Sequence, residues 1–186
     1  MALLLEKVTR RGWYPLQLTS KITISGILLA LGILLPSVFH TFGMGIIFLP
    51  MHIPVLLGGF IVGPVYGACI GLFIPLLSTL LTGMPPTMPP IAQMMMVELT
   101  VYGLLTGFFY QNLRQGVFVS LIMAMLGGRI VYGILGALAL PLFGLPKIDF
   151  LYPITTGLVT SIPGILIQLI LIPVLVLAIE KRNHQF

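Results

Sequence analysis

Charged residues are scarce in this sequence, and their scarcity excludes most classes of protein. Of 186 residues only 7% are Asp, Glu, Lys or Arg, whereas 58% are hydrophobic, and residues 22–97 contain no charged side chain. An ordinary soluble domain has about 25% charged residues, and a disordered chain is rich in charge and poor in apolar residues. The mean hydropathy of +1.15 therefore indicates a polytopic membrane protein.

Residues that most enzymes and metal sites require are also missing. Cys69 is the only cysteine, so neither an intrachain disulfide nor a cysteine metal cluster is possible. Asp149 is the only aspartate, which excludes a pair of intramembrane catalytic aspartates. The H-E-x-x-H, G-x-S-x-G and P-loop motifs do not occur. We therefore expect no enzyme activity, no metal and no cofactor. The chain cannot hydrolyse ATP by a P-loop, so any energy that it uses has to come from elsewhere.

The apolar sequence is long enough for six membrane-spanning helices. A helix that crosses a bilayer core of about 30 Å needs roughly 20 residues. The apolar runs are continuous rather than alternating, which argues against transmembrane strands. Breaks rich in Gly, Pro and polar residues then predict an all-α integral membrane protein, a single six-helix domain over residues 1–186 with spans at 22–39, 46–62, 66–81, 91–110, 117–140 and 154–179.

Proline marks two special segments. Pro50 and Pro54 interrupt the second predicted span near its start. Four prolines also fall within residues 85–90, between the third and fourth spans. Such a segment cannot stay helical, so we expect a stiff, extended cap.

Positive charges predict the orientation in the membrane. With six spans, both termini and Arg114 share one side. Seven basic residues then lie on that side: Lys7, Arg10, Arg11, Lys21, Arg114, Lys181 and Arg182. The positive-inside rule places that side, and both termini, in the cytoplasm. Charges that flank the hydrophobic spans in this way argue against nucleic-acid binding.

Small residues recur at intervals of four along two predicted spans. They are Gly63, Gly67 and Gly71 in one segment, and Gly103 and Gly107 in another. Stripes of this kind let helix backbones approach closely in lipid. Packing within the bundle is the simpler interpretation, and contact with a second protein is the alternative.

Two charges fall inside predicted spans. Glu98 and Arg129 each lie about 18–20 Å above the inner end of consecutive helices, at 1.5 Å per residue. A charge at a helix centre costs about 2.5–3.5 kcal/mol, so we expect the two side chains to meet. They are either a buried ion pair that only fixes helix register or the polar floor of a water-accessible cavity in the outer half.

Nearby polar residues favour the cavity. They are Gln93 and Tyr102 close to Glu98, Tyr132 close to Arg129, and His52 at the expected cavity mouth. These polar residues do not all lie on one helix face. No shared metal site is expected from the three histidines.

Five segments together resemble the substrate-binding S components of energy-coupling factor (ECF) vitamin transporters. They are FLPMHIPVLLGGF at 48–60, GPVYG at 63–67, LTGMPP at 81–86, ELTVYG at 98–103 and GRIVYG at 128–133. The resemblance covers nearly the whole chain and is nearest to the branch assigned to pantothenate. It implies a multi-pass protein of the bacterial plasma membrane that binds a water-soluble vitamin.

The resemblance also implies a mechanism and partners. The pocket faces outward and is capped by loops that include His40, Met84, Pro85 and Pro86 here. A small-x-x-x-small patch on the first helix, Gly26 and Ala30 here, docks on a transmembrane coupling protein (the T component). Two ABC ATPases supply the energy, and the S component is thought to topple in the membrane to release its substrate. A pantothenate carboxylate would suit Arg129.

Other functions stay open at this point. The vitamin or precursor could instead be hydroxymethylpyrimidine, pyridoxine or niacin. An intramembrane carboxylate can also relay protons in a proton-coupled secondary transporter, although no inverted repeat is visible here. A membrane scaffold without a substrate is the third alternative.

Overall fold

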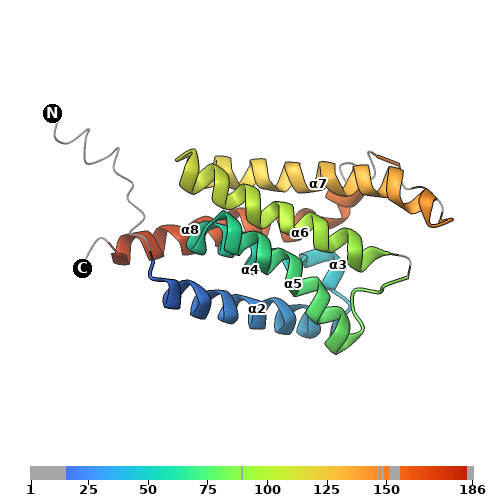
Figure 1. Ribbon diagram of the computed structural model, residues 1–186, viewed down its shortest axis with the longest axis horizontal. Coiled ribbons are helices and arrows are strands. Elements are labelled where there is room, and N and C mark those ends of the chain that lie inside the picture. Colours follow the sequence, from blue (N-terminus) through green and yellow to red (C-terminus); the bar gives the residue numbers. More distant parts are fainter. Residues whose placement is uncertain (1–15, 89, 146, 148, 151–155, 184–186) are drawn as a thin grey trace.

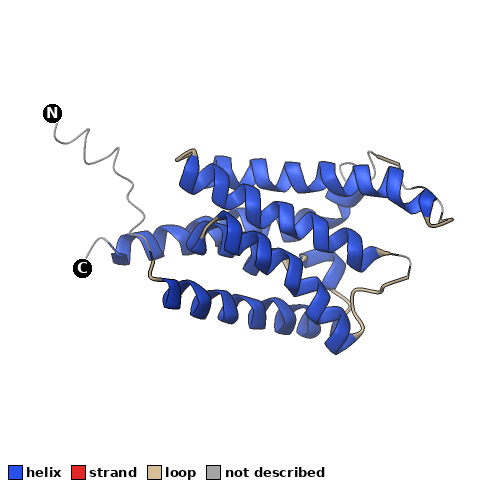
Figure 2. Cartoon of the chain, viewed as in Figure 1, coloured by secondary structure: helices blue, strands red, loops and turns tan. Residues whose placement is uncertain are grey.

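The computed structural model describes residues 16–88, 90–145, 147, 149–150 and 156–183, and every regular element within them is a helix (Figures 1 and 2). The elements are α2 (Leu18–Thr41), α3 (Gly45–Phe48), α4 (His52–Val62), α5 (Pro64–Thr82), α6 (Ile91–Gly107), the π-helical turn η1 (Phe108–Asn112), α7 (Val117–Leu142) and α8 (Thr156–Asn183). The six longer helices in the described residues, α2 and α4 to α8, confirm the prediction of an all-α, six-helix fold.

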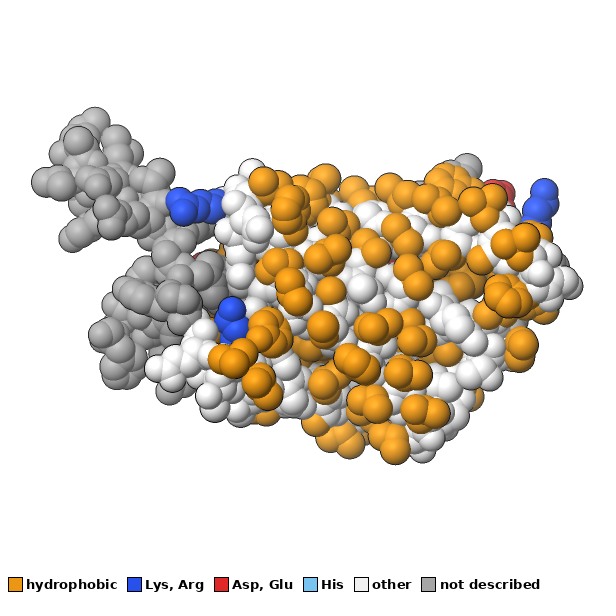
Figure 3. Space-filling view, in the orientation of Figure 1, with side chains coloured by type: hydrophobic (Ala, Val, Ile, Leu, Met, Phe, Trp, Pro, Cys, Tyr) orange, Lys and Arg blue, Asp and Glu red, His pale blue; other side chains and the backbone are white. Residues whose placement is uncertain are grey.

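Five of the helices are long and apolar enough to cross a membrane. These segments are Leu18–Phe39, Pro64–Thr82, Ile91–Asn112, Val117–Leu142 and Val159–Lys181. Hydrophobic side chains spread over the length of the bundle on the face shown in Figure 3, while charged side chains gather at its two ends. An apolar surface of this size is expected where a protein contacts lipid.

The second predicted span, 46–62, is not one continuous helix. It consists of α3, a break at Leu49–Met51, and α4. Pro50 causes the break, because proline disfavours helical backbone at the residue before it and cannot donate to the preceding turn. Pro54 does not interrupt α4, because it lies in the first turn, where backbone N–H groups have no intrahelical partner. At 11 residues, or about 17 Å, α4 is too short to cross the bilayer alone.

Helix α4 is the central helix of the bundle. All of its residues except Ile53 and Ile61 are buried. A helix that is hydrophobic all round is stable only when it is surrounded by other protein or by lipid. Here α2, α5, α6 and α8 surround it, so a short buried helix supports the site from inside.

The predicted glycine stripes bring α5 and α6 into close contact. A Cβ atom on Gly67 would lie 2.7 Å from the Gly103 carbonyl oxygen, and one on Gly71 would lie 2.2 Å from the Leu99 carbonyl oxygen. Larger side chains cannot be placed there without separating the helices. The stripes therefore serve packing within the bundle, which confirms the simpler of the two interpretations.

Figure 1 shows the start of α2, the α6–α7 turn and the end of α8 at one end of the bundle. Lys21, Arg114 and Lys181 belong to these three segments, so these three basic residues share one end of the bundle, as the six-span topology predicts. That this end faces the cytoplasm stays a prediction. Three predicted basic residues lie outside the described part of the chain: Lys7, Arg10 and Arg11.

Candidate binding site

A cavity of about 490 Å³ lies toward the opposite end of the bundle, near α3 and the α5–α6 loop. Its lining residues are Pro36, Gly45, Leu49, Pro50, Met51, His52, Met84, Pro85, Pro86, Ile91, Met95, Glu98, Arg129 and Tyr132. The volume falls in the range of about 300–1,000 Å³ that is typical of small-molecule sites. Most of the wall is apolar, and the polar groups come from α4, α6 and α7.

The break between α3 and α4 forms one wall of the cavity. Leu49 caps α3 with a φ of 48°, in the left-handed region that few non-glycine residues adopt. Leu49, Pro50 and Met51 all line the cavity. Non-helical backbone inside a membrane protein is tolerated where it is buried in protein or lines a cavity. The proline that ends the helix therefore also shapes the site.

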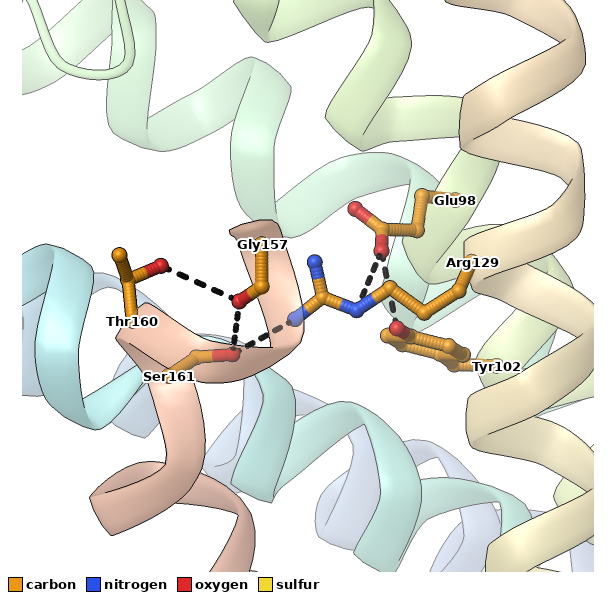
Figure 4. Close-up of polar contacts among 6 residues, drawn as sticks. All are labelled: Glu98, Tyr102, Arg129, Gly157, Thr160 and Ser161. Carbon is orange, nitrogen blue, oxygen red and sulfur yellow. Dashed lines mark hydrogen bonds and ion pairs between the residues drawn. The ribbon is translucent and has the colours of Figure 1, made fainter. Parts of the chain in front are cut away.

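Glu98 and Arg129 meet in the cavity wall, as their matched depth predicts (Figure 4). Nε of Arg129 lies 3.7 Å from Oε1 of Glu98, and the two side chains are 13% and 3% exposed. Nη2 of Arg129 also donates to Oγ of Ser161, at 3.2 Å, and Ser161 in turn donates to the Gly157 carbonyl. One guanidinium thus links α6, α7 and α8 beside the cavity.

Tyr102 contacts the same carboxylate oxygen of Glu98 that lies nearest to Nε of Arg129. It lies one helical turn after Glu98 and donates its hydroxyl hydrogen to Oε1 at 2.8 Å. Tyr102 is fully buried and does not line the cavity. Gly128 makes room for its ring, because a Cβ atom there would lie 2.1 Å from Cε1 of Tyr102. The glycine before Arg129 is therefore required for the polar wall.

His52 is an unsatisfied polar group at the cavity. It begins α4, lines the cavity and is 3% exposed. By distance and angle, neither ring nitrogen has a hydrogen-bond partner within the described residues, although the backbone of Leu49 lies close enough to interact with the ring. The ring packs against that of Tyr102, with centroids 5.2 Å apart. Leaving a buried polar group unpaired costs about 1–3 kcal/mol, so a ligand that pairs with His52 would recover that free energy.

Both partners of the Glu98–Arg129 ion pair can form further hydrogen bonds. In Figure 4 one guanidinium nitrogen of Arg129 and one carboxylate oxygen of Glu98 have no contact to the residues drawn. The guanidinium nitrogen can donate and the carboxylate oxygen can accept a hydrogen bond. The wall therefore suits a ligand that has an acceptor, such as a carboxylate, and a donor, such as a hydroxyl.

Most of the predicted binding and capping residues converge on this cavity: Glu98, Arg129, Tyr132, His52, Met84, Pro85 and Pro86. Gln93 does not line it and is exposed on α6. The reason is helical geometry, because five residues separate Gln93 from Glu98, which corresponds to about 140° around the helix. His40 falls near the end of α2, and its side chain lies outside the described part of the structure. Substrate binding by any of these residues stays a prediction.

Several contributors to the site carry no clear signal in the sequence. Ser161 is one serine in an apolar span, and its contact with Arg129 depends on how α7 and α8 pack. Pro36 of α2 and Met95 of α6 add to the apolar wall. Met95 lies three residues before Glu98, a spacing that places the two on one helix face, and this spacing was the available signal.

The described residues contain no group of three His, Cys, Asp or Glu side chains able to hold a metal ion. The cavity instead combines a mostly apolar wall with a few polar side chains: His52, Glu98, Arg129 and Tyr132. Together with the apolar helices, they define a class: a membrane-embedded binding protein for a small, partly polar molecule.

A comparison with known protein families shows which family of that class the chain belongs to. The sequence model of the family described as "ECF transporter, substrate-specific component" matches residues 20–176. The chain therefore belongs to the family of substrate-specific (S) components of ECF transporters. Neither the curated proteins nor the solved structures gave a match.

Family membership gives the chain its role. It is a substrate-binding transport subunit and not an enzyme, and it is a multi-pass protein of the plasma membrane. S components of this family act together with a transmembrane T component and ATPase subunits.

Proposed function

We propose that this S component captures a water-soluble vitamin with a carboxylate, and that the vitamin is pantothenate. It takes the vitamin from outside the cell and delivers it inward with ATP hydrolysed by two ABC ATPases below the coupling protein. The observation that carries the proposal is the position of Arg129, at the wall of the cavity with one guanidinium nitrogen that contacts none of the residues drawn in Figure 4.

Arg129 favours a carboxylate over a neutral group. A guanidinium offers rigid, planar donors that match the two oxygens of a carboxylate. Nη2 donates to Ser161, whereas Nε lies 3.7 Å from Oε1 of Glu98, beyond hydrogen-bonding distance. The third guanidinium nitrogen has no contact to the residues drawn in Figure 4, and we propose that it donates to the carboxylate.

The apolar part of the cavity supports pantothenate in particular. Pantothenate has a geminal dimethyl group beside its hydroxyls, and such a group needs an apolar surface. Leu49, Met51, Met84 and Met95 supply that surface, and methionine adapts well to an irregular ligand shape. Hydroxymethylpyrimidine and pyridoxine lack the carboxylate that Arg129 would hold. Niacin has one, but it has no hydroxyl for the other polar groups.

The test is a binding measurement on the purified chain. Native mass spectrometry first identifies any small molecule that is retained. Calorimetry then compares pantothenate with pantothenol, in which an alcohol replaces the carboxylate. We expect pantothenol to bind at least about tenfold more weakly, the effect of losing one hydrogen bond to a charged group. Equal affinity for the two would contradict the role of the carboxylate.

A further inference from the structure

We infer that His52 selects, among small carboxylates, those that carry a hydroxyl group. The inference rests on the proposed function, because it assumes that Arg129 holds the carboxylate in the same cavity. It adds a second point of recognition and so a narrower class of substrate: hydroxy acids and their amides rather than simple or aromatic acids.

The inference starts from the two unpaired ring nitrogens of His52. The side chain is buried, lines the cavity and has no partner for either nitrogen in the described residues. Both nitrogens are also closed to solvent in this structure. A ligand whose polar group reaches one of them would supply the hydrogen bond that the buried ring lacks.

A hydroxyl is the group best suited to pair with the His52 ring. A neutral imidazole has one donor and one acceptor nitrogen, and which nitrogen carries the hydrogen is set by its surroundings. A hydroxyl both donates and accepts, so it can pair with either nitrogen. A carboxylate only accepts, and Arg129 already attracts it.

The contacts of His52 also fix its distance from Arg129. The His52 ring packs on the Tyr102 ring, the Tyr102 hydroxyl binds Glu98, and Glu98 pairs with Arg129. Because Gly128 has no side chain, the Tyr102 ring packs directly against α7. Because each member of this chain of contacts is buried or nearly so, His52 and Arg129 are held at a set separation. A ligand fits both only if its hydroxyl and its carboxylate are similarly spaced.

The test uses three probes and two substitutions. The probes are pantothenate, pantothenol, and dideoxypantothenate, in which hydrogen replaces both hydroxyls. His52→Leu removes both ring nitrogens, and His52→Gln keeps one donor and one acceptor. We expect His52→Leu to weaken pantothenate and pantothenol by about tenfold to a hundredfold and to change dideoxypantothenate by less than about threefold. His52→Gln should recover part of the loss.

Thermal unfolding without ligand separates recognition from a structural role. Because His52→Leu removes an unsatisfied buried polar group, its melting temperature should equal or exceed that of the unsubstituted protein. A lower melting temperature together with equal losses for all three probes would mean that His52 supports the fold, and would overturn the inference.

The remaining outcomes separate the two proposals. Equal losses for all three probes in a stable His52→Leu protein, with binding that still depends on Arg129, would overturn the role of His52 and leave the proposed function standing. If the unsubstituted protein binds none of the three probes, both proposals are wrong.

Discussion

Arg129 contacts Glu98 and Ser161 and also faces the cavity, so three explanations of the buried charges can be compared at this one residue. It serves only to hold the helices together, or it pairs with a proton-relaying Glu98, or it holds the substrate carboxylate. The three explanations predict different results for simple substitutions.

If Arg129 holds the carboxylate, Arg129→Met weakens substrate binding by about 1.5–3 kcal/mol or more, the scale of a charge-assisted hydrogen bond. Arg129→Lys should restore binding only in part, because lysine keeps the charge and loses the planar fork. Calorimetry on both variants measures the effect, with thermal unfolding as the control for folding. Unchanged affinity in a well-folded Arg129→Met protein would end this explanation.

Replacing both charges separates the structural explanation from the others. A Glu98→Gln, Arg129→Met double variant leaves no unpaired buried charge, so we expect it to fold as well as the unsubstituted protein and still to bind substrate poorly. Full transport by the double variant would show that the pair only stabilises the bundle. Glu98→Gln alone tests proton relay: loss of uptake with intact binding would favour a proton-coupled mechanism.

At the scale of elements, the α5–α6 loop is stiffened by prolines and is held to the end of α5 by hydrogen bonds. Oγ of Ser78 and Oγ1 of Thr79, in the last turns of α5, donate to the carbonyl oxygens of Met84 and Pro85, each at 2.8 Å. Met84, Pro85 and Pro86 line the cavity. Proline limits the conformations of the loop, so less entropy is lost when it orders over a ligand.

Replacing Pro85 and Pro86 by glycine should therefore weaken substrate binding, chiefly through faster dissociation. We expect a several-fold increase in the off-rate, since each substitution adds conformational freedom of about 0.4–1 kcal/mol. Stopped-flow or surface plasmon resonance measures both rates. An unchanged off-rate would show that the loop does not act as a lid.

The contact between α5 and α6 depends on glycine at Gly103. A Cβ atom there would lie 2.1 Å from the Gly67 carbonyl oxygen, so Gly103→Ala should lower the stability of the protein by about 1–3 kcal/mol, the usual cost of overpacking. Gly26→Ala is the matched control, because no atom lies within 4 Å of its added Cβ. Thermal unfolding in detergent compares the two. Equal melting temperatures would show that the helices can separate without cost.

At the scale of the whole molecule, α2 is set apart from the other spans. It packs mainly on α4 and α5, and it is the least buried of the five candidate spans. Gly26 and Ala30 both lie on its exposed face. The small residues predicted to dock on the coupling protein are therefore directed away from the bundle, where a second membrane protein can reach them.

Gly26→Leu or Ala30→Leu should block assembly with the coupling protein and leave substrate binding intact, because the added side chain separates two helices at a close contact. Co-purification with the T component and calorimetry on the isolated chain measure the two effects. Ala178→Leu, on the exposed face of α8, is the matched control. Normal assembly of both α2 variants would mean that docking uses another face.

The sequence by itself determined the class of fold and the pairing of the two buried charges. Scarce charge and continuous apolar runs leave the chain only helices as membrane-compatible structure. The regular rise of a helix then places Glu98 and Arg129 at one depth. These conclusions depend on local helix geometry and on solvation, and both follow from the order of residues in the sequence.

The tertiary structure decided which side chains join the cavity beyond those that the sequence predicted. Ser161 reaches Arg129, and Pro36 reaches the wall, only because of the way α8 and α2 pack against the bundle. The break at Pro50 turned one predicted span into a short buried helix, which placed His52 inside the cavity with its ring nitrogens unpaired. Residues distant in sequence are brought together by helix packing, and the pattern along any single helix does not contain that information.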